Sequence, residues 1–215
     1  MKILLTAINA KYIHSNLAVY SLRACAGEYK ESVYLAEYTI NNQKDYILEE
    51  LYKKKPDVLC FSCYIWNIDI VAGISKEIHK IMPDVPIWLG GPEGSYDCDM
   101  QLKKYPWIKG IISGEGEVSF YELINHYLAE TVGNIKVGLN IPGLSDIKGI
   151  VYREDAVASG VDNIVTNPPR ENMSMDDIPF PYTKDAGFDI DTLKNRIIYY
   201  ETSRGCPYGC SYCLS

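Results

Sequence analysis

The chain has 215 residues, of which 47% are hydrophobic, and its formal net charge is −7. This length supports one substantial hydrophobic core with a smaller appended part. The acidic balance and the lack of basic clusters argue against a nucleic-acid-binding surface, and no apolar run has the length needed to cross a bilayer. We therefore expect a cytoplasmic protein that acts on a small molecule.

The first 130 residues alternate between short apolar runs, typical of buried parallel strands, and segments with helical spacing. The expected strands are 2–8, 33–38, 57–64, 85–89 and 108–112, and the expected helices are 17–25, 44–54, 68–82, 100–105 and 120–128. Strands that alternate with helices imply right-handed crossovers. The sequence predicts an α/β fold of the flavodoxin-like (Rossmann-like) kind, with a doubly wound, five-stranded parallel sheet.

The pattern changes after about residue 132. Residues 149–153 and 157–164 flank a Glu154-Asp155 turn and predict a β-hairpin appendage. Four prolines between 167 and 182 indicate an extended linker, and 196–201 predicts one more strand. We therefore divide the chain into a sheet domain (1–132), a hairpin and linker region (133–185) and the start of a further domain (186–215).

A ligand of such a sheet is expected beyond the carboxyl ends of the strands. Glycines in two of the loops there let a ligand approach the backbone, and the start of the helix that follows 114–117 favours an anionic group. Ser62 can donate a hydrogen bond to a buried base. No G-x-G-x-x-G follows the first strand, which disfavours a dinucleotide. The candidate binding residues at this edge are Ser62, Gly90, Gly91, Gly114, Glu115 and Gly116; a tight turn at the paired glycines is the structural alternative.

The last dozen residues contain a cysteine motif. The run TSRGCPYGCSYC places Cys206, Cys210 and Cys213 in C-x3-C-x2-C spacing. Three thiolates on one loop can hold three irons of a cubane cluster and leave the fourth iron open to another ligand. No histidine lies nearby, as a zinc site of three cysteines would require, and seven cysteines form no even disulfide framework. The spacing therefore indicates an iron–sulfur site.

This motif, with an aromatic residue before its third cysteine, resembles the signature of the radical S-adenosylmethionine (SAM) enzymes. The resemblance implies that Cys206, Cys210 and Cys213 hold a [4Fe-4S] cluster, that SAM chelates its open iron, and that Tyr212 lies beside the adenine. An external electron donor would then drive cleavage of SAM to a 5′-deoxyadenosyl radical. The catalytic barrel of that family needs about two hundred further residues, so we expect the chain to be a truncated form that is inactive alone, with 196–201 as the first barrel strand.

A sheet domain before a radical SAM motif resembles the cobalamin-binding module of the cobalamin-dependent radical SAM enzymes. The cobalamin pattern is D-x-H-x-x-G, then S-x-L, then G-G. In this chain His14, Ser62 and Gly90-Gly91 occupy the corresponding places, whereas Tyr12, Leu17 and Tyr64 replace the Asp, Gly and Leu. A ligating imidazole is usually oriented by a carboxylate, so loss of the Asp predicts a cobalt without a His ligand; His14 would instead cap the first helix or bond the backbone.

These resemblances imply the amino-terminal, cobalamin-binding region of a radical SAM enzyme that transfers a methyl group to, or oxidatively cyclises, an unactivated carbon. The group includes the anaerobic magnesium-protoporphyrin IX monomethyl ester cyclases. One alternative is a methylthiotransferase-like enzyme, whose leading domain holds a second cluster through three cysteines. The cysteines available for that are Cys25, Cys60, Cys63 and Cys98, which we interpret as small core residues. The other alternative is a docking module that binds no corrin.

Overall fold

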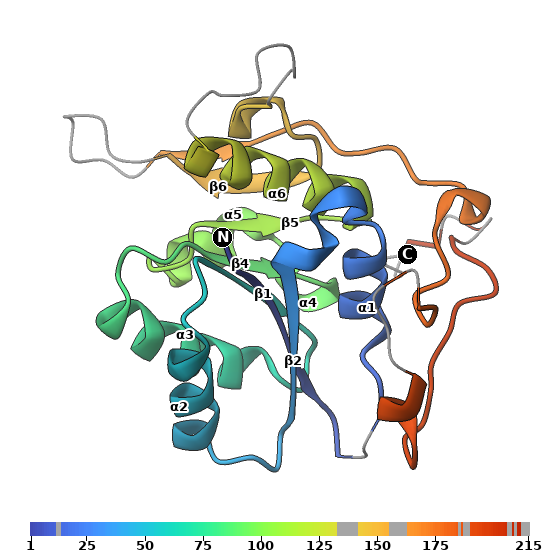
Figure 1. Ribbon diagram of the computed structural model, residues 1–215. Coiled ribbons are helices and arrows are strands. Elements are labelled where there is room, and N and C mark those ends of the chain that lie inside the picture. Colours follow the sequence, from blue (N-terminus) through green and yellow to red (C-terminus); the bar gives the residue numbers. More distant parts are fainter. Residues whose placement is uncertain are drawn as a thin grey trace.

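Seven strands form one sheet in the computed structural model (Figure 1). The structure describes residues 1–11, 14–132, 142–154, 163–184, 186, 190–205, 208, 210 and 211. The strands are β1 (Ile3–Asn9), β2 (Val33–Thr39), β3 (Val58–Ser62), β4 (Ile87–Gly90), β5 (Gly110–Ile112), β6 (Ile150–Arg153) and β7 (Ile164–Thr166). The α-helices are α1 (Leu17–Ala24), α2 (Lys44–Lys54), α3 (Ile68–Ile81), α4 (Pro92–Ser95), α5 (Cys98–Lys104) and α6 (Glu117–Val132).

The strand order is β2-β1-β3-β4-β5-β6-β7, and the first five strands are parallel. The order of those five is the flavodoxin-like one, in which the chain turns back at the first strand. The predicted doubly wound α/β fold is therefore confirmed. β6 and β7 are antiparallel, so the predicted hairpin does not stand apart but extends the sheet beyond β5. Most of the second predicted hairpin strand (157–164) lies outside the described residues, which omit 155–162.

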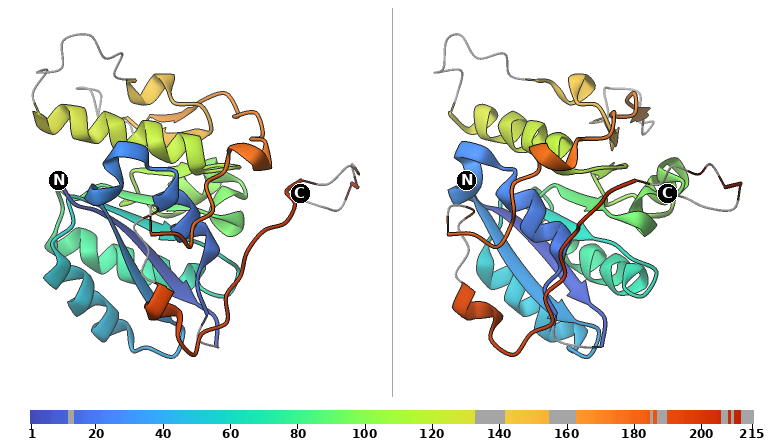
Figure 2. Two further views of the ribbon diagram at one scale, coloured as in Figure 1. Left: turned by 45° about the vertical axis from the view of Figure 1, so that its right-hand side comes forward. Right: turned by 90° about the vertical axis from the view of Figure 1, so that its right-hand side faces the viewer.

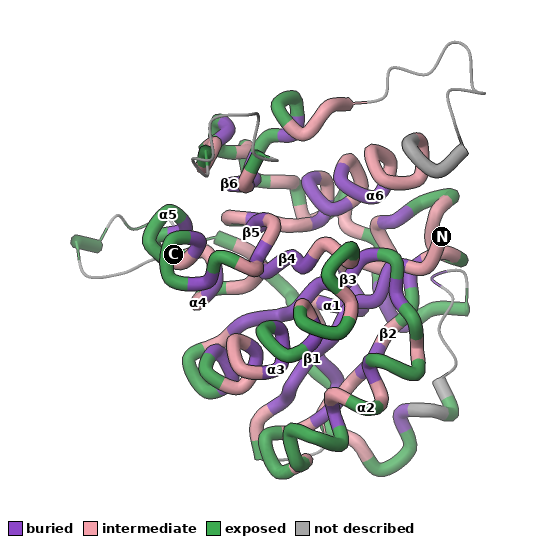
Figure 3. Tube along the Cα trace, turned by 90° about the vertical axis from the view of Figure 1, so that its left-hand side faces the viewer, coloured by how far each residue is buried: buried purple, intermediate pink, exposed green. Residues whose placement is uncertain are grey.

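Helices cover both faces of the sheet (Figures 1 and 2). Along β1 the side chains alternate, so Leu4 packs with α2 and α3 on one face and Leu5 packs with α1 and α6 on the other. Every residue of β1 and β3 is buried, which explains why their sequences read as continuous apolar runs. Figure 3 shows the same division: the strands are buried, and the helices that surround them have one exposed side.

Helix α2 has the bounds that the sequence predicts. Its apolar residues Ile47 and Leu51 are buried. It ends at Lys54 and is capped by Lys55, which has a left-handed φ of 47° and precedes Pro56. A proline disfavours the helical conformation of the residue before it. Helix α6 begins three residues earlier than predicted, at Glu117, whose carboxylate suits the positive end of the helix dipole.

Residues 196–204 cross the carboxyl edge of the sheet rather than forming the predicted strand at 196–201. Ile197 makes one isolated bridge with His14, and Ser15 N donates to Ile197 O at 3.0 Å. Figure 2 shows this segment in red, running past α1. The proline-rich stretch before it is also anchored, because Met173 N donates to Glu115 Oε2 at 2.7 Å.

None of the helices in the described ranges is both long enough and apolar enough to span a membrane.

Candidate functional site

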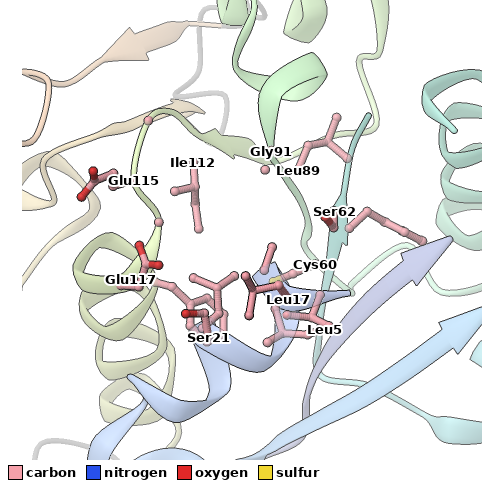
Figure 4. Close-up of a pocket in the computed structure, with 18 of the residues that line it drawn as sticks. Leu5, Leu17, Ser21, Cys60, Ser62, Leu89, Gly91, Ile112, Glu115 and Glu117 are labelled. Atoms are coloured by element: carbon pink, nitrogen blue, oxygen red, sulfur yellow. The ribbon is translucent and has the colours of Figure 1, made fainter. Parts of the chain in front are cut away.

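A pocket of about 530 Å³ opens at the carboxyl ends of β3, β4 and β5 (Figure 4). Its walls are the sheet, α1 and the start of α6, and the loops after β3, β4 and β5 form its rim. This volume lies within the roughly 300–1,000 Å³ typical of small-molecule and cofactor sites. The pocket is where the strand order predicts a ligand, at the carboxyl edge of an open parallel sheet.

The inner wall of the pocket is apolar and rigid. Leu5, Trp88 and Phe120 line it and are almost completely buried. The Trp88 indole donates a hydrogen bond to the Tyr127 hydroxyl at 2.9 Å. Gly110 leaves room for this ring, because a Cβ there would lie 2.4 Å from it. An aromatic or aliphatic group can therefore enter the pocket without burying an unpaired polar atom against this wall.

The two glycines predicted as a pair have different roles. Gly91 has a φ of +92°, and a Cβ on it would lie 2.6 Å from the backbone oxygen of Cys63. The loops after β3 and β4 are joined here by a hydrogen bond from Cys63 N to Gly90 O of 2.7 Å. At Gly90, by contrast, a Cβ would meet its nearest neighbour at 3.9 Å. Only Gly91 of this pair is required by the backbone, because its φ and its close contact both exclude a side chain.

Ser62 lies at the end of β3 and lines the pocket, and its Oγ is buried without a hydrogen bond of good geometry. The Tyr64 hydroxyl lies nearby: burial raises the pKa of Tyr64, and the Ser62 hydroxyl partly offsets that rise. A buried hydroxyl without a partner costs free energy unless a ligand satisfies it. Ser62 therefore has the environment of a donor or acceptor for a bound molecule.

The loop after β5 brings carboxylates, not only backbone, to the rim. Glu117 is 5% exposed, and its Oε1 accepts a hydrogen bond from Arg204 Nη2 at 2.8 Å. Glu115 Oε2 lies 3.7 Å from Arg204 Nη1, and Glu201 Oε2 lies 2.6 Å from Nη2. Burial would lower the pKa of Arg204, but hydrogen bonds and charges from Glu117 and Glu201 outweigh it and raise the pKa. The helix start that we predicted for an anionic ligand group therefore already holds the carboxylate of Glu117.

Of this loop's predicted ligand residues, Gly114 is the most open. Its φ is +80°, and a Cβ there would have no atom within 4 Å. Gly116 is closely packed, since a Cβ on it would lie 3.1 Å from Leu22 Cδ2. Both glycines line the pocket, as does Glu115.

His14 is not among the residues that line the pocket. Its Nδ1 donates to Ser15 O at 3.0 Å, and its ring packs edge-on against Tyr199, with 5.2 Å between the ring centroids. The cap of α1 is Asn16, whose side chain accepts from Val19 N. The geometry of His14 is that of a backbone-bonded loop histidine.

The cysteine motif lies at the end of the described chain. Cys210 is exposed, whereas Cys206, Tyr212 and Cys213 lie outside the described residues. Burial raises the pKa of Cys60 and of Cys63 to about 12, as expected for small core residues. Among the described residues, no three His, Cys, Asp or Glu side chains gather as a metal site would require.

Sequence reasoning missed Arg204, Glu117 and Glu201 as parts of the site. The four residues of the loop Gly114–Glu117 indicated a backbone cradle for a ligand. Arg204, two positions before Cys206, carried no local sequence signal of a role in the site. The signal that could have pointed to the pairing is charge, since a loop with two carboxylates in a buried position needs a cation.

The fold and the pocket together define an open α/β domain with a ligand-sized cavity at its carboxyl edge. A family model described as the B12 binding domain matches residues 3–124. The chain belongs to this B12-binding domain family.

Relatives with further domains are also similar to the chain. The cobalamin-dependent radical SAM methyltransferase TokK of Streptomyces tokunonensis is 28% identical over 88% of this chain and 25% of its own length. The anaerobic magnesium-protoporphyrin IX monomethyl ester cyclase of Rubrivivax gelatinosus is 26% identical over 87% of this chain and 32% of its own length. The chain thus spans between a quarter and a third of these relatives, and the predicted resemblance to cobalamin-dependent radical SAM enzymes is confirmed.

A solved structure shows the same fold. The apo form of the cobalamin-dependent SAM radical enzyme OxsB superimposes with a TM-score of 0.68 at 20% identity, over 96% of this chain and 27% of that one.

Replacing Ser62 by Ala is expected to raise the free energy of unfolding of the ligand-free chain by about 1 kcal/mol, because it removes a buried hydroxyl without a good partner. The matched control is Ser75→Ala. The Ser75 hydroxyl accepts from Trp107 Nε1 at 2.9 Å and donates to Ala72 O at 3.1 Å, so its loss should lower that free energy by about 1 kcal/mol or more. Urea unfolding followed by circular dichroism measures both, and a destabilised Ser62→Ala chain would contradict the assignment.

Proposed function

We propose that the chain is the cobalamin-binding region of a radical SAM enzyme that transfers a methyl group to, or oxidatively cyclises, an unactivated carbon. The single observation that carries this proposal is the pocket beside Ser62 and Gly91, because it lies at the carboxyl edge of the sheet that matches the B12-binding family. The names of TokK and of the cyclase supply the two reaction types.

The pocket fits the nucleotide tail of cobalamin in its chemistry. The apolar wall at Leu5, Trp88 and Phe120 suits an aromatic base. The unsatisfied Ser62 hydroxyl can hydrogen-bond a ring nitrogen or a sugar hydroxyl of that tail. Gly91 keeps side-chain atoms out of the junction between the loops after β3 and β4. Bound cobalamin would supply a cobalt that can carry a methyl group, and these residues would hold and orient its tail.

Three further groups complete the proposed enzyme. Cys206, Cys210 and Cys213 would hold a [4Fe-4S] cluster, and Tyr212 would lie beside SAM at its open iron. The cluster would supply single electrons, which an external donor must deliver. We place the substrate between the corrin and the cluster, in contacts that a following barrel would provide.

The methylthiotransferase-like alternative is disfavoured by the cysteines of the sheet domain. Cys60 and Cys63 are buried on opposite faces of the sheet, and the four cysteines of this domain are all described without forming a metal-binding group. A second cluster would need three thiolates that converge.

Titration with hydroxocobalamin, followed by its absorption spectrum, is expected to show binding by the chain. Gly91→Val should weaken binding at least about tenfold, which is about 1.4 kcal/mol, because the new side chain must displace Cys63 from the rim. Gly73→Ala, in α3, is the control and should bind as the wild type does, since Gly73 does not line the pocket and the nearest atom to its Cβ would be Lys44 Nζ at 3.7 Å. Ser62→Ala, which should stay folded, should also bind more weakly. If the folded wild-type chain binds no cobalamin, the domain is a docking module.

The cobalt is expected to have no histidine ligand from this chain. His14 Nδ1 donates to Ser15 O, and among the described residues no carboxylate orients His14 as a ligand. Electron paramagnetic resonance of the cob(II)alamin complex should therefore show no splitting by an axial protein nitrogen, and His14→Ala should leave the spectrum unchanged. A nitrogen splitting that disappears in His14→Ala would assign the imidazole to the cobalt.

Anaerobic reconstitution with iron and sulfide is expected to give a cluster that depends on the three motif cysteines. Replacing Cys206, Cys210 and Cys213 together by Ser should abolish the iron–sulfur absorption, because serine hydroxyls do not replace the thiolates. Replacing Cys60 and Cys63 by Ser is the control and should leave iron uptake intact in the folded fraction. Equal iron in the triple variant and the wild type would show that the ligands lie elsewhere.

A further inference from the structure

The segment that leads to the cysteine motif is attached to the sheet domain at both ends. At its start, Arg196 Nη1 lies 3.0 Å from Glu37 Oε2 at the end of β2. At its end, Arg204 Nη2 lies 2.8 Å from Glu117 Oε1 at the start of α6. Between them, the Tyr182 hydroxyl donates to Tyr199 O at 2.7 Å and lies 2.8 Å from Ser15 Oγ. Residues 196–204 therefore form a strap across the carboxyl edge.

The two ends of this strap differ in their relation to the pocket. Arg204, Glu201 and Gly205 line the pocket together with Glu115 and Glu117, whereas Arg196 and Glu37 do not. The side chains of Arg204 and Glu117 are 16% and 6% exposed. Because removal of one partner from a buried ion pair leaves an uncompensated charge, the Arg204 end of the strap is held much more firmly than an exposed ion pair would hold it.

The strap ends at Arg204, directly before a glycine in a left-handed conformation. Gly205, with a φ of +82° and no atom within 4 Å of a Cβ position, turns the chain at this point.

We propose that Arg204 is a positioning residue: it holds the strap 196–204 at the wall of the pocket, so that filling the pocket with cobalamin and holding the strap in place favour each other. The inference rests on the proposed function. The physical basis is shared structure, because Glu115, Glu117 and Arg204 are at once a wall of the pocket and the anchor of the strap. A ligand that packs against this wall stabilises the anchored form, and linkage requires the anchored form to bind that ligand more tightly.

The experiment is hydrogen exchange of the strap, with and without hydroxocobalamin, in the wild type and in Arg204→Gln. Cobalamin should slow exchange of amides in 197–205 of the wild type. Arg204→Gln should speed their exchange without ligand and weaken cobalamin binding about tenfold, within the range of about 5- to 150-fold typical of coupled sites. Glu117→Gln should act in the same direction, and the effect of the double variant should be smaller than the sum of the two effects, because both variants break the same ion pair.

Arg170→Gln is the matched control. Arg170 pairs with Glu122, which lies on α6 as Glu117 does, and the Arg170 side chain is 14% exposed. Neither Arg170 nor Glu122 lines the pocket. Its loss should lower stability without changing either the exchange of 197–205 or the affinity for cobalamin. If Arg204→Gln and Arg170→Gln had the same effects, Arg204 would have only a structural role.

Failure of this inference can be told apart from failure of the proposed function. Wild-type chain that binds cobalamin, with unchanged exchange in 197–205 and unchanged affinity in Arg204→Gln, overturns the coupling alone. Wild-type chain that binds no cobalamin overturns both the function and the coupling.

Discussion

The contact between Gly91 and the backbone of Cys63 is the constraint on which the carboxyl edge depends. With no side chain and a φ of +92°, Gly91 lets the loop after β4 lie directly against the loop after β3. The hydrogen bonds from Cys63 N to Gly90 O and from Glu93 N to Cys63 O follow from this approach. They fix the end of β3, and hence Ser62, at the wall of a preformed pocket. A larger residue would separate the two loops and remove that wall.

Local patterns were enough to predict the parallel part of the sheet. Continuous apolar runs marked β1 and β3 because both are buried on two faces, and Pro56 marked the end of α2. The pairing of β6 with β5 was not predictable in the same way. The run 149–153, beside a turn, predicts a hairpin strand, but nothing in it specifies which sheet edge it joins. That choice depends on packing with distant residues, since Ile150 lies in the same core cluster as Phe120 and Leu123 of α6.

The candidate site also has a part that local sequence patterns predict and a part that depends on distant residues. Ser62, Gly90 and Gly91 could be placed because the carboxyl ends of neighbouring parallel strands meet at one edge. Arg204 could not, since its partners Glu115 and Glu117 are nearly 90 residues away in sequence and nothing local links them. The expected strand at 196–201 failed for a related reason. An apolar run predicts an extended backbone, and the segment is extended, but its hydrogen bonds go to the loop after β1 and to Tyr182 instead of to a strand ladder.

The loops of the carboxyl edge therefore have two uses. The loop after β1 holds the strap, through Ser15 N to Ile197 O and through the contact of His14 with Tyr199. The loops after β3, β4 and β5 form the pocket. Tyr12 stands where a carboxylate would orient a ligating imidazole, and His14 packs against the chain itself. This arrangement gives a physical account of one departure from the cobalamin pattern, Tyr12 in the place of the Asp, because the His14 ring is already held by Ser15 O and by Tyr199.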